Sequence, residues 1–233
     1  MIRLRSAVER PPDRRRNCGA WLREYPQHPA GLHDDGLGTL QVIRIPPGAG
    51  MPPHPRSDAE LVTYVRDGAL AYEDSSGRLG IIRAGEFSRV TGGPGIFWSE
   101  TNASRTEWAH VFQIWLGRAG TSIEPGREQK RFSAAERRGR FCVIASRDGR
   151  KGSLRVHRDA LVYSAIFSPG QHVVHELPPG RSAWLHMVQG EMTLGDIVLS
   201  TGYGVSVAAE RAISFTALRE SEILLLHRDE LAR

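Results

Sequence analysis

A repeated set of turn residues constrains the fold of this sequence more than any other feature. Ile45-Pro-Pro-Gly48 matches Phe167-Ser-Pro-Gly170, and a second glycine follows twenty positions later in each copy, as Gly68 and Gly190. The glycines correspond at an offset of 122 residues, and an apolar run precedes each second glycine. Because turns repeated around an apolar strand are typical of a duplicated structural unit, we expect one β unit to occur twice in the 233-residue chain.

Short alternating or β-branched runs favour strands over helices. Each run is bounded by glycine or proline, and Asp74-Ser-Ser-Gly77 is a turn sequence that would join two of them as a hairpin. The expected strands are Thr39–Ile45, Glu60–Arg66, Ala69–Asp74, Gly80–Arg83, Glu86–Val90, Ile96–Trp98 and Trp108–Leu116. The fold class predicted from this pattern is all-β.

Composition divides the chain into four segments. The first is polar, rich in arginine and interrupted by prolines, with one short strand expected near Ala20–Leu22. A later segment, rich in Gly, Arg, Glu and Ser, reads as a linker with a helical turn at Ser133–Glu136, where Ser133 can cap. The expected divisions are an N-terminal arm (1–38), a first strand-rich domain (39–116), the linker (117–140) and a second strand-rich domain (141–233).

Charge and hydropathy exclude several classes of function. The net charge of +5 and the cluster Arg14–Arg16 are basic, but the other arginines are scattered among acids, so we expect no nucleic-acid binding. No apolar run reaches the roughly 18 residues of a membrane span, and the N-terminus lacks the apolar core of a signal peptide. The two cysteines, Cys18 and Cys142, form no Cys-x-x-Cys motif, which favours a reducing compartment. We therefore expect a cytoplasmic protein without membrane contact.

Two polar sequence motifs contain the candidate catalytic and metal-binding residues. They are Gly48-x5-His54-x-Arg56-x3-Glu60 and Gly95-x2-Trp98-x3-Asn102. Their spacing resembles the two cupin motifs, and the wording Pro-His54-Pro, Glu60-Leu-Val-Thr-Tyr-Val65 and Ser99-Glu100 is similar to that of the pirin family. The resemblance implies a bicupin, in which two tandem cupin (jelly-roll-like) β-barrels pack face to face. It also implies a pocket in the N-terminal barrel.

The same motifs depart from the family pattern at two positions. The resemblance implies Pro-His-Pro-His and His-Ser-Glu, which together give three imidazoles and one carboxylate to a divalent metal. Here Arg56 and Trp98 replace two of those histidines, so that only His54 and Glu100 remain as possible ligands. A guanidinium and an indole have no lone pair for a metal, and two ligands hold a first-row metal weakly. We therefore expect no metal, with one divalent Fe, Cu, Ni or Zn ion as the alternative.

One hypothesis explains both substitutions: a positively charged side chain of the protein has replaced the metal cation. Arg56 would form a charge-assisted pair with Glu100, and Trp98 would fill the vacated volume. The alternative is that Arg56 points to solvent. The resemblance also places Gln113 at the pocket; His110, three residues earlier, then faces away by strand alternation.

The second copy lacks the first motif altogether. The offset of 122 carries His54 onto Glu176, so no His-x-His pair exists there and we expect a degenerate C-terminal cupin domain. His172, His175 and His186 could still meet in space, although their spacing does not require it.

Two classes of function remain open. In the first, the protein binds a small molecule, with an aromatic one as a candidate, or acts as an interaction or regulatory protein through a protein partner. In the second, implied by the resemblance, it is a metal-dependent quercetin 2,3-dioxygenase-like oxidoreductase, with Glu100 as the catalytic carboxylate. The expected pocket is the same for both: His54, Arg56, Trp98, Glu100 and Gln113.

Overall fold

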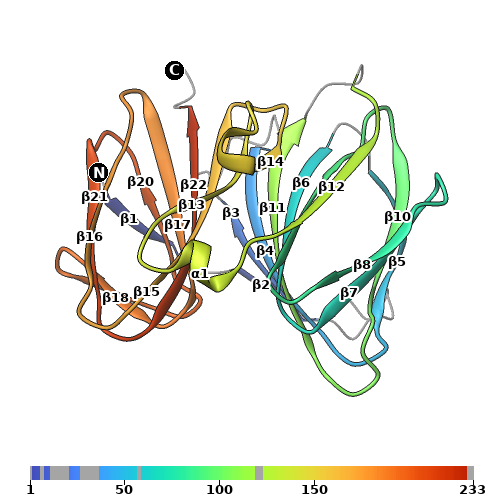
Figure 1. The fold of residues 1–233 in the computed structure, drawn as a ribbon, viewed down its shortest axis with the longest axis horizontal. Helices are drawn as coiled ribbons and strands as arrows, with labels where there is room; N and C mark the ends of the chain where they lie inside the picture. The colour runs from blue at the N-terminus through green and yellow to red at the C-terminus, as the bar shows by residue number, and fades with distance from the viewer. Residues whose placement is uncertain are drawn as a thin grey trace. The chain divides into compact units, whose positions relative to one another are not determined.

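The computed structural model describes residues 2–5, 8–10, 21–26, 37–56, 59–118 and 123–229. The chain divides into two compact units, one of Val8–Phe132 and the other of Met1–Ala7 with Ser133–Arg233 (Figure 1). Nearly all of the regular structure is strand, which confirms the predicted all-β class. Among the described residues, the helices are a single turn, α1 (Ala134–Arg137), and a 3-10 turn, η2 (Arg150–Gly152). No helix in these ranges is long and apolar enough to cross a membrane.

The N-terminal unit contains two sheets in its described part. The seven-stranded sheet has the order β12-β9-β6-β11-β4-β3-β2, and the four-stranded sheet has the order β5-β10-β7-β8. Their strands are β2 (Val8–Arg10), β3 (Trp21–Pro26), β4 (Leu37–Ile45), β5 (Gly50–Arg56), β6 (Ala59–Asp67), β7 (Ala69–Asp74), β8 (Leu79–Arg83), β9 (Glu86–Thr91), β10 (Ile96–Asn102), β11 (Ala109–Arg118) and β12 (Gly126–Arg131).

The C-terminal unit repeats this plan with a second pair of sheets. The orders are β1-β20-β17-β22-β15-β13-β14 and β16-β21-β18-β19 within the described ranges. The strands are β1 (Ile2–Arg5), β13 (Cys142–Ser146), β14 (Leu154–Arg155), β15 (Ala160–Phe167), β16 (His172–Glu176), β17 (Arg181–Gln189), β18 (Glu191–Leu194), β19 (Ile197–Ser200), β20 (Gly204–Val207), β21 (Ala212–Ala217) and β22 (Ser221–Asp229).

Strand pairing bears out the duplication. In the N-terminal unit, β11 lies between β4 and β6, where Gln113 faces Gln41 and Thr63. In the C-terminal unit, β22 lies between β15 and β17, where Leu225 faces Tyr163 and Leu185. Residues 41 and 63 correspond to residues 163 and 185 at the same offset of 122 that the turn glycines show. The two units are therefore copies of one β unit, and Gln113 corresponds to Leu225.

The matched glycines occupy equivalent strained turns. Gly68 and Gly190 have φ values of 75° and 96°, in the left-handed region that favours glycine. A Cβ at Gly68 would lie 2.7 Å from the carbonyl oxygen of Trp108, and one at Gly190 would lie 2.3 Å from that of Glu220. Each turn therefore needs glycine both for its backbone angle and for close packing.

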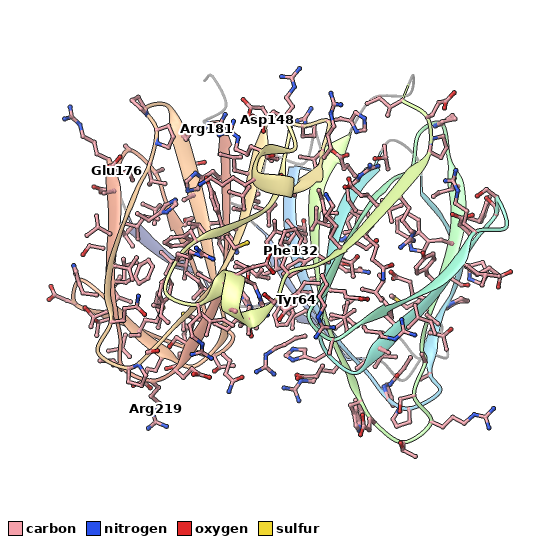
Figure 2. The ribbon with its side chains drawn as sticks, viewed as in Figure 1. Tyr64, Phe132, Asp148, Glu176, Arg181 and Arg219 are labelled. Carbon is pink, nitrogen blue, oxygen red and sulfur yellow. The ribbon has the colours of Figure 1, made fainter. Side chains whose placement is uncertain are left out.

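Each unit encloses an apolar interior between its two sheets. The two sheets of each unit remain separate, so each unit is a cupin-like jelly roll, which confirms the predicted fold class. Side chains fill the space between the sheets (Figure 2). In the C-terminal unit one large cluster, which includes Phe215 and Leu225, forms the core. In the N-terminal unit the interior contains two smaller clusters, one around Val65 and the other around Trp98. The face-to-face packing of the two domains stays a prediction.

The expected arm and linker both contribute strands. Residues 1–38 contain β1, β2 and β3: β1 pairs with β20, and β3 pairs with β4. The expected linker 117–140 contains β12, which pairs with β9 along its whole length and extends the N-terminal sheet. The segment boundaries therefore differ from those expected. The short strand expected near Ala20–Leu22 is β3, whereas polar composition concealed β1, β2 and β12, which are edge strands with charged side chains.

Two local predictions are confirmed. The sequence Asp74–Gly77 closes the β7–β8 hairpin: the backbone N–H of Gly77 donates to the carbonyl of Asp74 at 2.9 Å, and Oδ1 of Asp74 accepts from the N–H of Ser76 at 2.9 Å. Ser133 caps α1, and the Glu136 side chain accepts from the Ser133 backbone N–H at 2.7 Å, completing a capping box.

Candidate functional site

Glu100 and Gln113 form a buried polar pair in the interior of the N-terminal unit. Glu100 comes from β10 and Gln113 from β11, so the pair bridges the two sheets. Nε2 of Gln113 donates to Oε1 of Glu100 at 3.0 Å and to Oε2 at 2.9 Å. Only 3 % of Glu100 and 1 % of Gln113 is exposed. The amide therefore binds both oxygens of the carboxylate in a site that excludes most water.

Trp98 lies two residues before Glu100 on β10, on the same side of the strand. It is 1 % exposed and stacks on Trp115, with ring centroids 6.4 Å apart and planes 12° apart. The Trp115 indole N–H donates to Oε1 of Gln41 at 2.9 Å. Leu61, Val90 and Ile96 surround the stacked indoles. Trp98 therefore fills the interior next to Glu100 with aromatic surface.

β5 carries His54 and Arg56 along the other edge of β10. The register sets His54 opposite Trp98 and Arg56 opposite Ile96, and it shifts before Glu100 meets Met51. The side chains of His54 and Arg56 lie outside the described residues. An Arg56–Glu100 ion pair therefore stays a prediction.

Arg127 is a second charged residue near Glu100, and the sequence analysis did not single it out. It lies on β12, where the backbone pairs it with Val90, a member of the interior cluster around Trp98. Its guanidinium carbon is 3.5 Å from the centroid of the Tyr72 ring, and Nη1 donates to Oγ of Ser88 at 3.2 Å. Burial lowers the pKa of Arg127, and the charges of Glu100 and Asp74 act in the opposite direction. No signal in the sequence pointed to it, because β12 is polar at every position except its first glycine.

His110 lies on the opposite face of β11 from Gln113, as strand alternation predicts. Its Nδ1 is 3.6 Å from the Asp67 carboxylate, and its ring is 4.6 Å from that of Phe112. Burial lowers the pKa of His110 to about 4, so the ring is neutral at neutral pH. His110 therefore does not join Glu100.

The C-terminal histidines do not meet as a group of three. His172 is exposed and hydrogen-bonds to Thr216, with 3.0 Å between Nδ1 and Oγ1. His186 is buried on β17, whose neighbouring residues Leu185 and Met187 alternate with it and pack into the core. His175 instead meets His227 of β22, with their Nε2 atoms 2.9 Å apart. His227 was missed because the contact spans 52 residues between strands of different sheets.

Aromatic rings lie against this histidine pair. The Tyr163 ring lies 5.3 Å from His175 and 5.1 Å from His227. Burial lowers the pKa of His175 to about 4 and that of His227 to about 3. Both imidazoles are therefore neutral at neutral pH.

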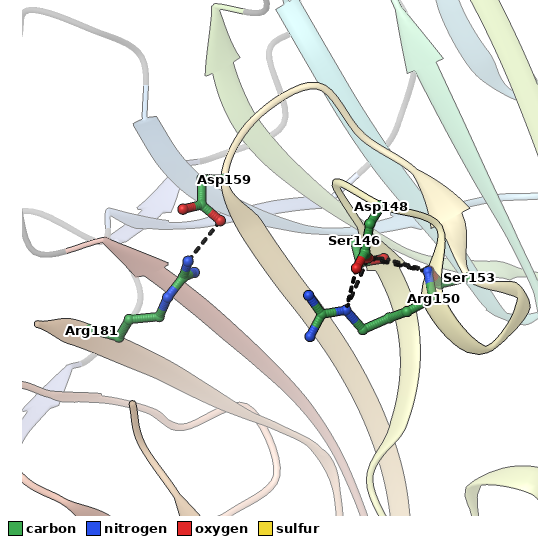
Figure 3. Close-up of polar contacts among 6 residues, drawn as sticks. All are labelled: Ser146, Asp148, Arg150, Ser153, Asp159 and Arg181. Atoms are coloured by element: carbon green, nitrogen blue, oxygen red, sulfur yellow. Dashed lines mark hydrogen bonds and ion pairs between the residues drawn. The ribbon is translucent and has the colours of Figure 1, made fainter. Parts of the chain in front are cut away.

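Two ion pairs lie elsewhere in this unit: Arg181 contacts Asp159 at 2.7 Å, and Arg150 contacts Asp148 at 2.9 Å (Figure 3).

Comparison with known proteins identifies the family. Residues 27–116 match the family described as Pirin, and residues 143–227 match the quercetinase C-terminal cupin domain. The chain belongs to the pirin family. The quercetin 2,3-dioxygenase of Escherichia coli (strain K12) is 38 % identical over 193 residues, which cover 82 % of each protein. A pirin-like protein of Caulobacter vibrioides is 33 % identical over 81 % of this chain and 83 % of the relative.

A solved structure supports the fold over the full length of the chain. The bacterial pirin YhhW of Escherichia coli, in complex with nickel(II), superposes with a TM-score of 0.85 at 31 % identity. The match covers 99 % of this chain and 100 % of YhhW. The sequence prediction of a pirin-like bicupin is thereby confirmed.

Trp98, Glu100 and Gln113 do not by themselves supply the ligand set that a divalent metal needs. Trp98 offers a donor N–H where a metal needs a lone pair, and both oxygens of Glu100 already accept hydrogen bonds from Gln113. Within the described ranges, no group of three or more His, Cys, Asp or Glu side chains is arranged to hold a metal ion. His54 would add one imidazole, which with Glu100 makes two ligands of the four that the family pattern implies.

Proposed function

We propose that the N-terminal domain of this pirin-family protein binds a small aromatic molecule without a metal and that the protein acts through binding instead of oxygenation. The observation that carries the proposal is the hydrogen bonding of Glu100, whose two oxygens both accept from Gln113. A carboxylate satisfied in this way by a neutral amide has less need of a metal cation. The aromatic nature of the ligand follows from relatives that are named for quercetin, a flavonol.

Electrostatics supports the same proposal. A carboxylate as buried as Glu100 is costly unless a cation or several donors stabilise it. Arg127 lies close enough for its charge to interact with that of Glu100. Arg56, two residues after His54, is proposed as the second internal cation. A divalent ion entering between these groups would meet positive charge where the family pattern supplies imidazoles.

The competing function is a quercetin 2,3-dioxygenase activity. It is favoured by the names of the relatives and by the nickel complex of YhhW. In that case His54 and Glu100 would bind a divalent ion that contacts the substrate oxygens. The reaction needs open positions on a firmly held ion, and a two-residue ligand set does not hold one firmly.

Elemental analysis of the purified full-length protein tests the proposal. Metal-free binding predicts far less than one equivalent of Fe, Ni, Cu or Zn per chain, even after expression in medium supplemented with these metals. Near-stoichiometric metal that survives dialysis, together with consumption of quercetin, would support the oxygenase. The Escherichia coli K12 relative, expressed and purified in parallel, is the matched control for metal loading.

A further inference from the structure

Arg127 carries a positive charge into the N-terminal unit, and no carboxylate of the described residues forms an ion pair with it. Its guanidinium stacks on Tyr72 and, within the described ranges, makes one hydrogen bond, to Ser88. The Nε atom is buried and has no hydrogen-bond partner among the described residues. A guanidinium has five N–H donors, and a desolvated cation is costly when those donors are unused. Most N–H donors of Arg127 therefore have no acceptor among the described residues.

The two nearest acids are engaged by other groups. Glu100 accepts from Gln113 through both oxygens. Oδ1 of Asp74 accepts from the backbone N–H groups of Ser76 and Arg78 at 2.9 and 3.2 Å, within the hairpin turn. Their charges attract Arg127, yet neither lies within the 4.0 Å of an ion pair in the described part of the chain. Pairing with Glu100 or Asp74 therefore does not account for the position of Arg127.

Two hydroxyl groups extend the donor surface around Arg127. Ser88 is fully buried, and its oxygen accepts from Arg127, which leaves the hydroxyl proton to donate elsewhere. The Tyr72 hydroxyl makes no hydrogen bond to the described residues. It lies over Gly80, where a Cβ would come within 2.5 Å of the Tyr72 oxygen. Glycine at position 80 therefore leaves room for this hydroxyl, and both hydroxyl groups belong to side chains that contact the Arg127 guanidinium.

We propose that the ligand of the N-terminal pocket is an anion, a planar aromatic carboxylate or phenolate whose charged oxygen is bound by Arg127 with the hydroxyls of Ser88 and Tyr72. The inference rests on the proposed function for the aromatic character of the ligand, and it adds the charge. Arginine suits such oxygens because its planar fork can donate two parallel N–H bonds. The face of the guanidinium that stacks on Tyr72 leaves its edge for these bonds.

Two probes of the same shape test the charge preference. Isothermal titration of the full-length protein at pH 7 compares 2-naphthoate with the neutral 2-naphthamide. We expect naphthoate to bind about tenfold to a hundredfold more tightly, as charge-assisted hydrogen bonds imply. Arg127→Gln should remove that preference, because it weakens the binding of naphthoate far more than that of naphthamide. Arg127→Lys, which keeps the charge but not the fork, should retain part of it.

Arg131→Gln is the matched control, because Arg131 is an exposed arginine on the same strand. It should leave the affinities for both probes unchanged. Thermal unfolding verifies that each variant is folded, and Arg127→Lys serves as the test if Arg127→Gln is not.

Each remaining outcome is informative. Equal affinities for the two probes, or a naphthoate preference that survives in Arg127→Gln, would overturn the inference while leaving metal-free binding intact. Failure of both probes to bind would also overturn it. An Arg127-dependent preference in a protein that carries one equivalent of metal would support the inference and refute the proposed function.

Discussion

The two domains share one strand arrangement and differ in what fills it. Gln113 in the N-terminal domain and Leu225 in the C-terminal domain occupy the same place between their neighbouring strands. Gln113 binds the carboxylate of Glu100, whereas Leu225 packs into a continuous apolar core with Phe215. One domain therefore places a carboxylate and an amide in its interior, and the other fills the same position with an apolar side chain.

Polar groups persist in the C-terminal domain at the next inward-facing position. His227 faces Leu161 and Ala183, whereas its counterpart Trp115 faces Thr39 and Leu61. The N-terminal domain thus covers its polar pair with stacked indoles, and the C-terminal domain covers its apolar core with two neutral imidazoles. The duplicated backbone therefore fixes which positions face the interior, while the residue type at each of these positions differs between the two domains.

The largest expected effect tests the shared backbone. Gly190→Ala should lower the free energy of unfolding by about 3 kcal/mol or more, because a left-handed φ is strained for alanine and the Cβ would overlap a carbonyl oxygen. Gly68→Ala should behave alike with a somewhat smaller loss. Gly77→Ala is the control: it has φ 79° with nothing within 4 Å of the added Cβ, and should cost about 1 kcal/mol. Urea unfolding measures all three, and equal losses would mean that contact plays no part.

The second prediction concerns a substitution that gives the N-terminal interior the apolar residue found at the matching C-terminal position. Gln113→Leu removes two hydrogen bonds from the buried Glu100 carboxylate and should destabilise the protein by about 2 to 3 kcal/mol. The double variant Glu100→Leu with Gln113→Leu should recover most of that loss, because it removes the buried charge as well. A double variant less stable than Gln113→Leu alone would show that Glu100 contributes stability through other contacts.

The third prediction concerns the acid sensitivity that the histidine pair gives to the C-terminal domain. His175 and His227 have pKa values of about 4 and about 3 in the folded protein, below the 6.5 of an exposed histidine. The unfolded chain therefore binds protons first, so their contribution is complete above pH 6.5 and is lost as the pH falls towards 4 and then 3. The loss should be on the order of 2 kcal/mol, after allowance for the partial exposure of His175.

Denaturant unfolding between pH 7.5 and 4 measures this loss. His227→Leu should flatten the pH dependence, because it removes the more deeply buried imidazole of the pair. The exposed His172→Gln is the control and should leave the curve unchanged. An unchanged slope in His227→Leu would assign the acid sensitivity to other groups, of which His110 is the first candidate.

The sequence predicted those parts of the structure that depend on local pattern. Ala69–Asp74 is a strand with the expected bounds, and alternation along β11 correctly separated Gln113 from His110. Arg127 was not predicted because its strand, β12, is polar throughout. Neither periodicity nor composition distinguished that strand from a linker. His227 escaped for another reason: its meeting with His175 depends on how two sheets face each other, which spacing in one sequence does not encode.

Calorimetric titration with Ni²⁺ tests the central claim that protein cations have replaced the metal. The unaltered protein and the single variants Arg56→His and Trp98→His should bind Ni²⁺ weakly or not at all, because each has at most three ligands. Arg56→His with Trp98→His restores the four-ligand family pattern and should bind Ni²⁺ tightly, with one equivalent per chain. Tight binding by the unaltered protein, or none by the double variant, would contradict the account.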